Sequence, residues 1–117
     1  MNTATLAELM EMVIRFRKER DWAQFHTPKE LAISLCVESA ELLELMQWKS
    51  GAELKRAIKV QRQHMVDELA DVLHSLLLLG HDLKVDLGEA LAQKLQKTAA
   101  KYPVHKAKGK PRKYTEL

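Results

Sequence analysis

Residues 27–45 read TPKELAISLCVESAELLEL, and this stretch indicates most directly how the chain folds. It begins with Thr27, whose hydroxyl can cap a helix, followed by proline at the first helical position and Glu30 in the first turn. Its leucines recur every three or four residues, which is typical of the buried side of an amphipathic helix. At about 100° per residue, however, Glu38 falls in the middle of this leucine stripe and Glu41 at its border. Two acids therefore lie where a surface glutamate would not normally be.

Two other segments show the same pattern of a capping residue followed three positions later by glutamate, and they begin at Ser50 and Asp86. With an amphipathic stretch near the start of the chain, they predict four helical segments, the third interrupted near residues 60–63. The predicted segments are 3–20, 28–49, 52–82 and 87–101. From Pro103 onward we expect extended or disordered structure. The sequence therefore predicts an all-α protomer similar to a four-helix bundle, and its several apolar sides predict a homo-oligomer, a dimer or tetramer.

The positive charge of the chain is concentrated at its end. The 117 residues carry a formal net charge of +3. Residues 101–117 hold six of the 19 basic residues but only one of the 16 acidic residues, so the rest of the chain is slightly acidic. We therefore expect one helical domain over residues 1–103 and a basic tail over residues 104–117.

The sequence also bears on the compartment. Its longest uninterrupted apolar run is residues 76–79, far short of the roughly 20 residues that span a bilayer. The first residues lack the basic start and apolar stretch of a signal peptide. Cys36 is the only cysteine and can form no disulfide within the chain. We therefore expect a cytoplasmic protein without membrane contact.

Two of the predicted helices each carry a pair of acids three residues apart beside apolar positions, Glu38-x-x-Glu41 and Glu68-x-x-Asp71. If the helices face each other, four carboxylates converge, and each pair about 6 Å apart repels by roughly 3 kcal/mol at an effective dielectric of 20. Protons or cations must then neutralise them. Oxygen ligands favour Mg²⁺, with Mn²⁺ as an alternative, and Mg²⁺ commonly takes substrate phosphates as further ligands. The simpler interpretation is two solvated acidic faces.

The two acid pairs, separated by 26 residues, resemble the signature of the MazG-like superfamily of all-α nucleoside triphosphate pyrophosphohydrolases. Flanking segments are similar to its dCTP pyrophosphatase branch. These segments are RDWAQFH (20–26), QWK (47–49), DELADVL (67–73), KYPV (101–104) and KYTEL (113–117). The resemblance implies hydrolysis of dCTP, or of a related modified deoxynucleotide, to the monophosphate and pyrophosphate with Mg²⁺. It also implies a homo-oligomer of helical bundles with sites between chains.

The resemblance further implies the site residues. The metal ligands would be Glu38, Glu41, Glu68 and Asp71, of which Glu41 and Glu38 would also be catalytic. The substrate would be bound by Trp22, His26, Trp48, Ser75, Lys94, Lys101 and Tyr102. Relatives often have tyrosine where this chain has Ser75 and asparagine where it has Thr98, which leaves the base, the sugar and the phosphate contacts open.

Two other functions are considered. A non-catalytic helical module for oligomerisation or interaction would use the apolar stripes alone and would tolerate alanine at Glu38 and Glu68. A nucleic-acid binder would use the basic tail, but the body is acidic and the tail offers only Tyr102 and Tyr114 for stacking. We therefore expect no nucleic-acid partner.

Overall fold

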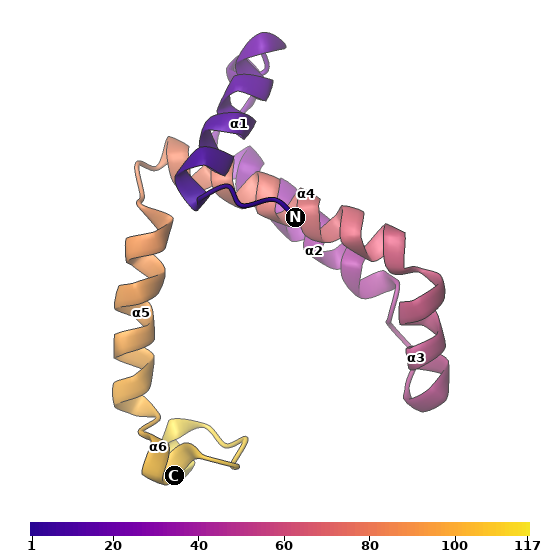
Figure 1. Cartoon of the computed structure of the whole chain (residues 1–117), viewed down its shortest axis with the longest axis vertical. Coiled ribbons are helices and arrows are strands. Elements are labelled where there is room, and N and C mark those ends of the chain that lie inside the picture. The colour runs from indigo at the N-terminus through magenta and orange to yellow at the C-terminus, as the bar shows by residue number, and fades with distance from the viewer. The chain divides into compact units, whose positions relative to one another are not determined.

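The structure, a computed structural model, describes residues 1–117 and contains helices but no strand, so the predicted all-α class is confirmed. The chain divides into two compact units, a first unit of residues 1–84 and a second unit of residues 85–117 (Figure 1). The first unit contains α1 (Leu6–Glu19), the 3₁₀ turn η1 (Ala23–Phe25), α2 (Pro28–Glu44), α3 (Gly51–Val60) and α4 (Arg62–Asp82). The second contains α5 (Leu87–Lys101), α6 (Val104–Ala107) and the 3₁₀ turn η2 (Tyr114–Glu116).

The helix starts predicted at residues 28, 52 and 87 are found at or within one residue of these positions, whereas the first helix, predicted from residue 3, begins at Leu6. The hydroxyl of Thr27 accepts a hydrogen bond of 3.2 Å from the backbone N–H of Glu30, and Asp86 caps α5 in the same way through the N–H of Glu89. Such caps satisfy backbone donors that the first turn leaves without partners. Ser50 occupies the capping position of α3 but makes no side-chain hydrogen bond there.

The helix ends differ from the prediction. α2 stops at Glu44 instead of residue 49, and the chain then turns through Trp48, whose φ of 66° is left-handed and cannot continue a right-handed helix. The predicted segment 52–82 is two helices, α3 and α4, with the break at Gln61 inside the expected window. The tail expected to be extended or disordered instead forms the short elements α6 and η2.

The core of the first unit lies between α2 and α4, which run side by side in opposite directions because α3 returns the chain between them (Figure 1). Its most buried side chains are Leu31 of α2 and Leu77 and Leu78 of α4. α1 also packs on α4 and is tied to it by the buried Arg17, which donates two hydrogen bonds of 2.8 Å to Asp82.

This core leaves many large apolar side chains of the first unit exposed. Val37 and Leu43 on α2 and Leu69 on α4 are each about half exposed. Exposed apolar surface of this extent is typical of surfaces that meet another protein chain. None of the helices combines the length and the apolar character needed to cross a bilayer.

Candidate active site

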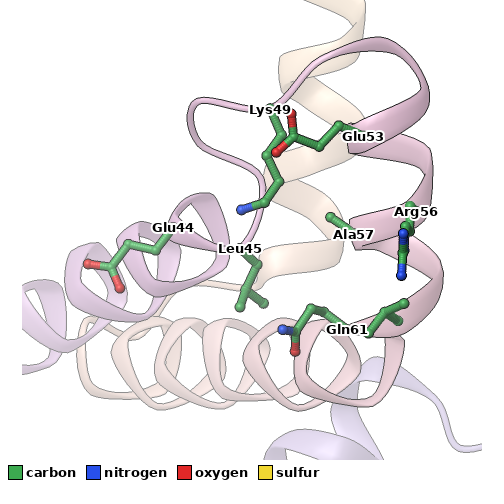
Figure 2. A pocket seen from close by; sticks show the side chains of 8 residues that line it. Glu44, Leu45, Lys49, Glu53, Arg56, Ala57 and Gln61 are labelled. Carbon is green, nitrogen blue, oxygen red and sulfur yellow. The ribbon is translucent and has the colours of Figure 1, made fainter.

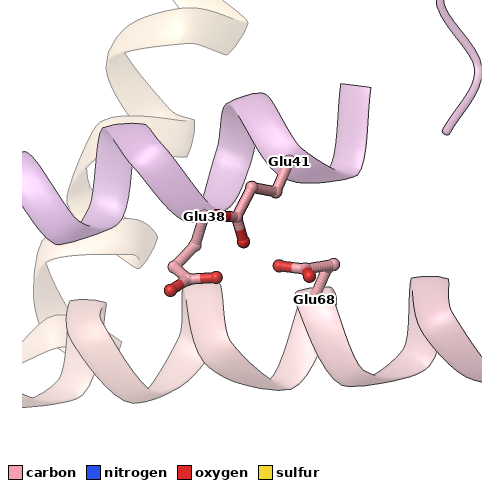
Figure 3. A group of neighbouring side chains, drawn as sticks. All are labelled: Glu38, Glu41 and Glu68. Atoms are coloured by element: carbon pink, nitrogen blue, oxygen red, sulfur yellow. The ribbon is translucent and has the colours of Figure 1, made fainter. Parts of the chain in front are cut away.

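Three carboxylates from the two central helices meet in one place. Glu38 and Glu41 come from α2 and Glu68 from α4, and each offers an oxygen within 4.8 Å of the others (Figure 3). Glu68 is buried, Glu38 is half-buried and Glu41 is exposed. We call these three residues the acid cluster. The predicted face-to-face approach of the two acid-bearing helices is therefore present in the structure.

No lysine or arginine forms an ion pair with the carboxylates of the acid cluster. The Oε2 atoms of Glu38 and Glu68 are buried and have no hydrogen-bond partner. The pKa of Glu38 is raised to about 7, chiefly by the hydrogen bond between its protonated form and Glu68, then by burial and by the negative charges of Glu41 and Asp71. At neutral pH the cluster therefore requires either a bound proton or a cation.

The ligand atoms suit a hard divalent cation. They are carboxylate oxygens without sulfur, which is the donor set that Mg²⁺ and Mn²⁺ prefer. The remaining oxygen of Glu68 lies 3.4 Å from Nε2 of the exposed His64. Asp71 is exposed and stands outside the close group, although its charge still acts on Glu38. The structure thus brings three of the four predicted metal ligands into one cluster, with the fourth beside it.

A cavity of about 300 Å³ adjoins the acid cluster, and Glu38 belongs to both. The cavity is lined by Trp22, His26, Leu31, Ser34, Glu38, Asp71, His74, Ser75 and Leu78. Trp22, His26, Glu38, Asp71 and Ser75 are among the residues that the sequence singles out. An open cavity of this size with mixed apolar and polar walls fits a small organic ligand.

The connector before α2 positions Trp22 and His26 at this cavity. The backbone reverses at Asp21, whose φ of 52° is left-handed, and the amide of Gln24 donates to the Asp21 carbonyl. The ring of Trp22 packs edge-on against Phe16 of α1, with ring centres 5.8 Å apart. His26 directly precedes the α2 cap, and its Nδ1 is buried without a partner, so it can still bond a ligand.

Sequence reasoning missed two polar residues of the cavity, Ser34 and His74. Ser34 lies one helical turn before Glu38, so the helical spacing that identifies Glu38 also places Ser34 on the same side of α2. His74 lies three residues after Asp71, and its ring packs edge-on against Phe16 with centres 5.9 Å apart. Phe16 comes from another helix, so no local pattern around His74 predicts this contact.

Four predicted substrate residues are not part of this cavity. Trp48 lies in the turn after α2 and is 92% exposed. Lys94, Lys101 and Tyr102 belong to the second unit, where Nζ of Lys101 lies 4.8 Å from the ring centre of Tyr114. Tyr102 packs edge-on against the same ring. Their roles in substrate binding stay predictions.

A second cavity, of about 360 Å³, lies where the α2 end, α3 and the start of α4 meet (Figure 2). It is lined by Glu44, Leu45, Lys49, Glu53, Arg56, Ala57, Val60 and Gln61. Its two acidic and two basic residues balance in charge, and its wall contains none of the buried polar atoms that lack hydrogen-bond partners. It therefore shows no feature that points to a ligand.

Comparison with known proteins assigns the family. Residues 33–117 match the MazG-like family. The chain is 40% identical over 115 residues to dCTP pyrophosphatase 1 of Rattus norvegicus and 39% identical to that of Homo sapiens, each alignment covering 97% of this chain and 68% of the relative. The crystal structure of a pyrophosphatase from Archaeoglobus fulgidus superposes with a TM-score of 0.79 at 35% identity, over 88% of this chain and 96% of that chain.

The fold and the acid cluster define an all-helical protein with a carboxylate site between two antiparallel helices. Together with these similarities they show that the chain belongs to the MazG-like family, so the resemblance seen in the sequence is confirmed.

Proposed function

We propose that this protein is a Mg²⁺-dependent hydrolase that converts a nucleoside triphosphate, dCTP or a related modified deoxynucleotide, to the monophosphate and pyrophosphate. The observation that carries the proposal is that Glu38 belongs both to the acid cluster and to the wall of the cavity. A phosphate chain bound beside the acids would lead directly into a space of small-molecule size. The names of the similar proteins, dCTP pyrophosphatase 1 and a pyrophosphatase, support this activity.

In this proposal Glu38, Glu41 and Glu68 hold the cation, with Asp71 as the fourth carboxylate. When bound, Mg²⁺ or Mn²⁺ neutralises charge on the phosphate oxygens and lowers the pKa of a coordinated water. Glu41 is the exposed member of the acid cluster, so it can contact solvent and accept the proton of the attacking water. Glu38 couples the cluster to the substrate, because its side chain also lines the cavity.

The cavity binds the nucleoside in this proposal. Trp22 offers an aromatic surface to the base, and the unpartnered Nδ1 of His26 can hydrogen-bond to its polar edge. Ser75 lies one helical turn beyond Asp71 on α4 and contributes a hydroxyl group to the cavity wall. Leu31 and Leu78 exclude water from the apolar part of the wall.

The remaining predicted residues complete the site in a homo-oligomer, a dimer or tetramer. We assign Trp48 to the base, and Lys94, Lys101 and Tyr102 to the phosphates, as the family resemblance implies. A tryptophan that is 92% exposed in its own chain supports sites shared between chains. We also assign the protein to the cytoplasm, in keeping with its single, unpaired cysteine.

A screen of the nucleoside triphosphates with Mg²⁺ tests the proposal, with the products identified by chromatography and phosphorus NMR. We expect the monophosphate and pyrophosphate in equal amounts, with dCTP or a modified dCTP turned over fastest. Glu38→Gln and Glu68→Gln should lower kcat by at least about 100-fold because each removes a charged ligand. Glu44→Gln, on α2 but outside the acid cluster, is the matched control and should keep wild-type activity.

Release of orthophosphate instead of pyrophosphate would overturn the reaction type. Full activity of Glu38→Gln or Glu68→Gln would remove that residue from the site. If no triphosphate were cleaved and both variants kept the oligomeric state of the wild type, the non-catalytic interaction module would be the better description.

A further inference from the structure

The two central helices place matched pairs of residues along the cavity. Four positions from Glu38 on α2 and from Asp71 on α4, the cavity is lined by a serine on each helix, Ser34 and Ser75, and His74 precedes Ser75 on α4. Three positions beyond the serines follow Leu31 and Leu78. Glu38 and Asp71 line the same cavity, and α2 and α4 run in opposite directions, so equal steps away from these two acids keep the members of each pair facing each other. The cavity therefore has an acid layer, a serine layer and a leucine layer.

The spacing of these layers matches the order of groups in a nucleotide. Four residues of an α-helix rise about 6 Å, so the serine layer lies one helical turn from the acids. A nucleotide whose phosphates are held at the acid layer places its pentose next and its base farther away. The base end coincides with the leucine layer, near the start of α2, and the connector that leads into this helix brings Trp22 and His26 to the cavity. The serine layer is then at the level of the sugar.

The two serine hydroxyls are free to bind a ligand. In this protein other helical hydroxyls bond back to their own helix, as Ser39 does to the Leu35 carbonyl at 2.7 Å and Thr98 to the Lys94 carbonyl at 3.0 Å. The structure contains no such bond for Ser34 or Ser75, and both line the cavity. A serine hydroxyl can both donate and accept a hydrogen bond, which suits another hydroxyl group as its partner.

We propose that Ser34 and Ser75 bind the hydroxyl groups of the substrate pentose and make the enzyme selective for sugars that carry them. This inference rests on the proposed function, because it requires phosphates at the acid layer. It assigns Ser34 to substrate binding and specifies for Ser75 the part of the substrate it contacts. His74, which precedes Ser75 in the cavity wall, packs edge-on against Phe16 and is not needed for this contact.

The test compares dCTP with dideoxycytidine triphosphate (ddCTP), which lacks the remaining sugar hydroxyl, on the wild type and on the double variant Ser34→Ala/Ser75→Ala. For the wild type we expect kcat/KM to be about 3- to 10-fold lower with ddCTP, the size of effect of a neutral hydrogen bond. The double variant should lose this preference, because its kcat/KM for dCTP falls while that for ddCTP stays unchanged. Ser39→Ala is the matched control and should keep the preference.

Two results would overturn the inference. One is an equal loss of kcat/KM for both substrates in the double variant, which indicates a structural effect. The other is a preference for dCTP that persists without the two hydroxyls. Calorimetric binding of dCMP and ddCMP to the same proteins gives a second measurement that does not depend on turnover. If the wild type cleaves no triphosphate, the proposed function fails, and the affinities of the two monophosphates still decide the role of the serines.

Discussion

Glu38 shows how a single residue links stability to ligand binding. Its carboxyl group faces Glu41, Glu68 and Asp71, and these neighbours together with burial raise its pKa to about 7 from an ordinary 4.5. An acid whose pKa is higher in the folded chain holds its proton more tightly there than in the unfolded chain. Its protonated form therefore favours folding, and this contribution is lost as the pH rises from about 4.5 through about 7.

We therefore expect the wild type without divalent cations to lose stability between about pH 5 and pH 7.5 relative to Glu38→Gln, which cannot ionise. Adding Mg²⁺ at neutral pH should raise the melting temperature of the wild type by mass action and that of the variant much less. Thermal unfolding followed by circular dichroism measures both effects. Parallel pH profiles for the two proteins, or equal stabilisation by Mg²⁺, would contradict this account of the acid cluster.

At the residue scale the sequence predicted the acids well and the cavity only in part. Glu38 was found because it breaks the leucine stripe, a signal that needs only the helical period. Ser34 gives no such contrast, since a serine is tolerated on either side of a helix. The roles proposed for both serines can be inferred only when the register between α2 and α4 is known, and that register is a tertiary property.

Between elements, the strongest specific contact joins α1 to α4. The guanidinium of Arg17 donates two hydrogen bonds to Asp82, and the side chains are only 8% and 19% exposed. This pairing holds the pKa of Asp82 down to about 2, below its ordinary 3.8, despite a burial effect in the opposite direction. The charged form is therefore favoured in the folded chain, and the contact stabilises the fold above about pH 4.

We expect this stabilisation, about 2 kcal/mol, to be lost as the pH falls from about 4 to about 2. Asp82→Asn should cost about 3–5 kcal/mol at neutral pH, because it leaves the buried charge of Arg17 unpaired. Urea unfolding at several pH values measures both. The exposed pair of Arg20 and Glu19, 3.8 Å apart, is the control, and Glu19→Gln should change the stability by less than about 1 kcal/mol. Equal effects of the two substitutions would show that burial of the ion pair is unimportant.

In the second unit, the turn η2 contacts the end of α5 through one aromatic ring. Tyr114 packs edge-on against Tyr102 with ring centres 5.9 Å apart and lies 4.8 Å from Nζ of Lys101. Each contact is worth roughly 0.5–1 kcal/mol, enough to hold a short terminal segment in place. This contact explains why a segment rich in lysine, glycine and proline is more ordered than its composition predicts.

Tyr114→Ala should therefore loosen the segment from residue 104 to the end, whereas Tyr114→Phe keeps the ring and should not. We expect trypsin to cleave after the lysines of this segment about 5- to 10-fold faster in the alanine variant, in line with the loss of about 1 kcal/mol. Limited proteolysis with mass spectrometry identifies the cleavage sites. Unchanged cleavage in the alanine variant, or equal acceleration in the phenylalanine variant, would contradict a role of the ring.

At the element scale, helix starts were predictable because a cap is a local pattern of two residues, as at Thr27 and Asp86. The end of α2 was not predictable, because none of the residues directly after Glu44 prevents a helix by itself. After Glu44 the chain turns and reaches Trp48, whose backbone is left-handed and whose indole is exposed, and such an arrangement depends on surroundings beyond local sequence.

For the whole molecule, the exposed apolar side chains and Trp48 raise the question of what covers them. In the proposed homo-oligomer, the acid cluster of one chain and Trp48 of a partner chain contribute to the same site. A chain defective at Trp48 and a chain defective at Glu38 would then each carry the half that the other lacks. Mixed oligomers would contain some sites with both halves intact, whereas sites built within one chain would all be defective.

We therefore expect Trp48→Ala and Glu38→Gln, each of low activity alone, to recover activity when co-expressed and purified together. For a randomly mixed dimer with two shared sites, about a quarter of wild-type activity should return. Steady-state assays of the co-purified protein give the recovery, with sedimentation velocity to establish the oligomeric state. The matched control pairs Glu38→Gln with Glu68→Gln, which lie in one cluster and should not complement each other. Recovery no greater than the sum of the separate variants, in a protein shown to form mixed oligomers, would place Trp48 outside a shared site.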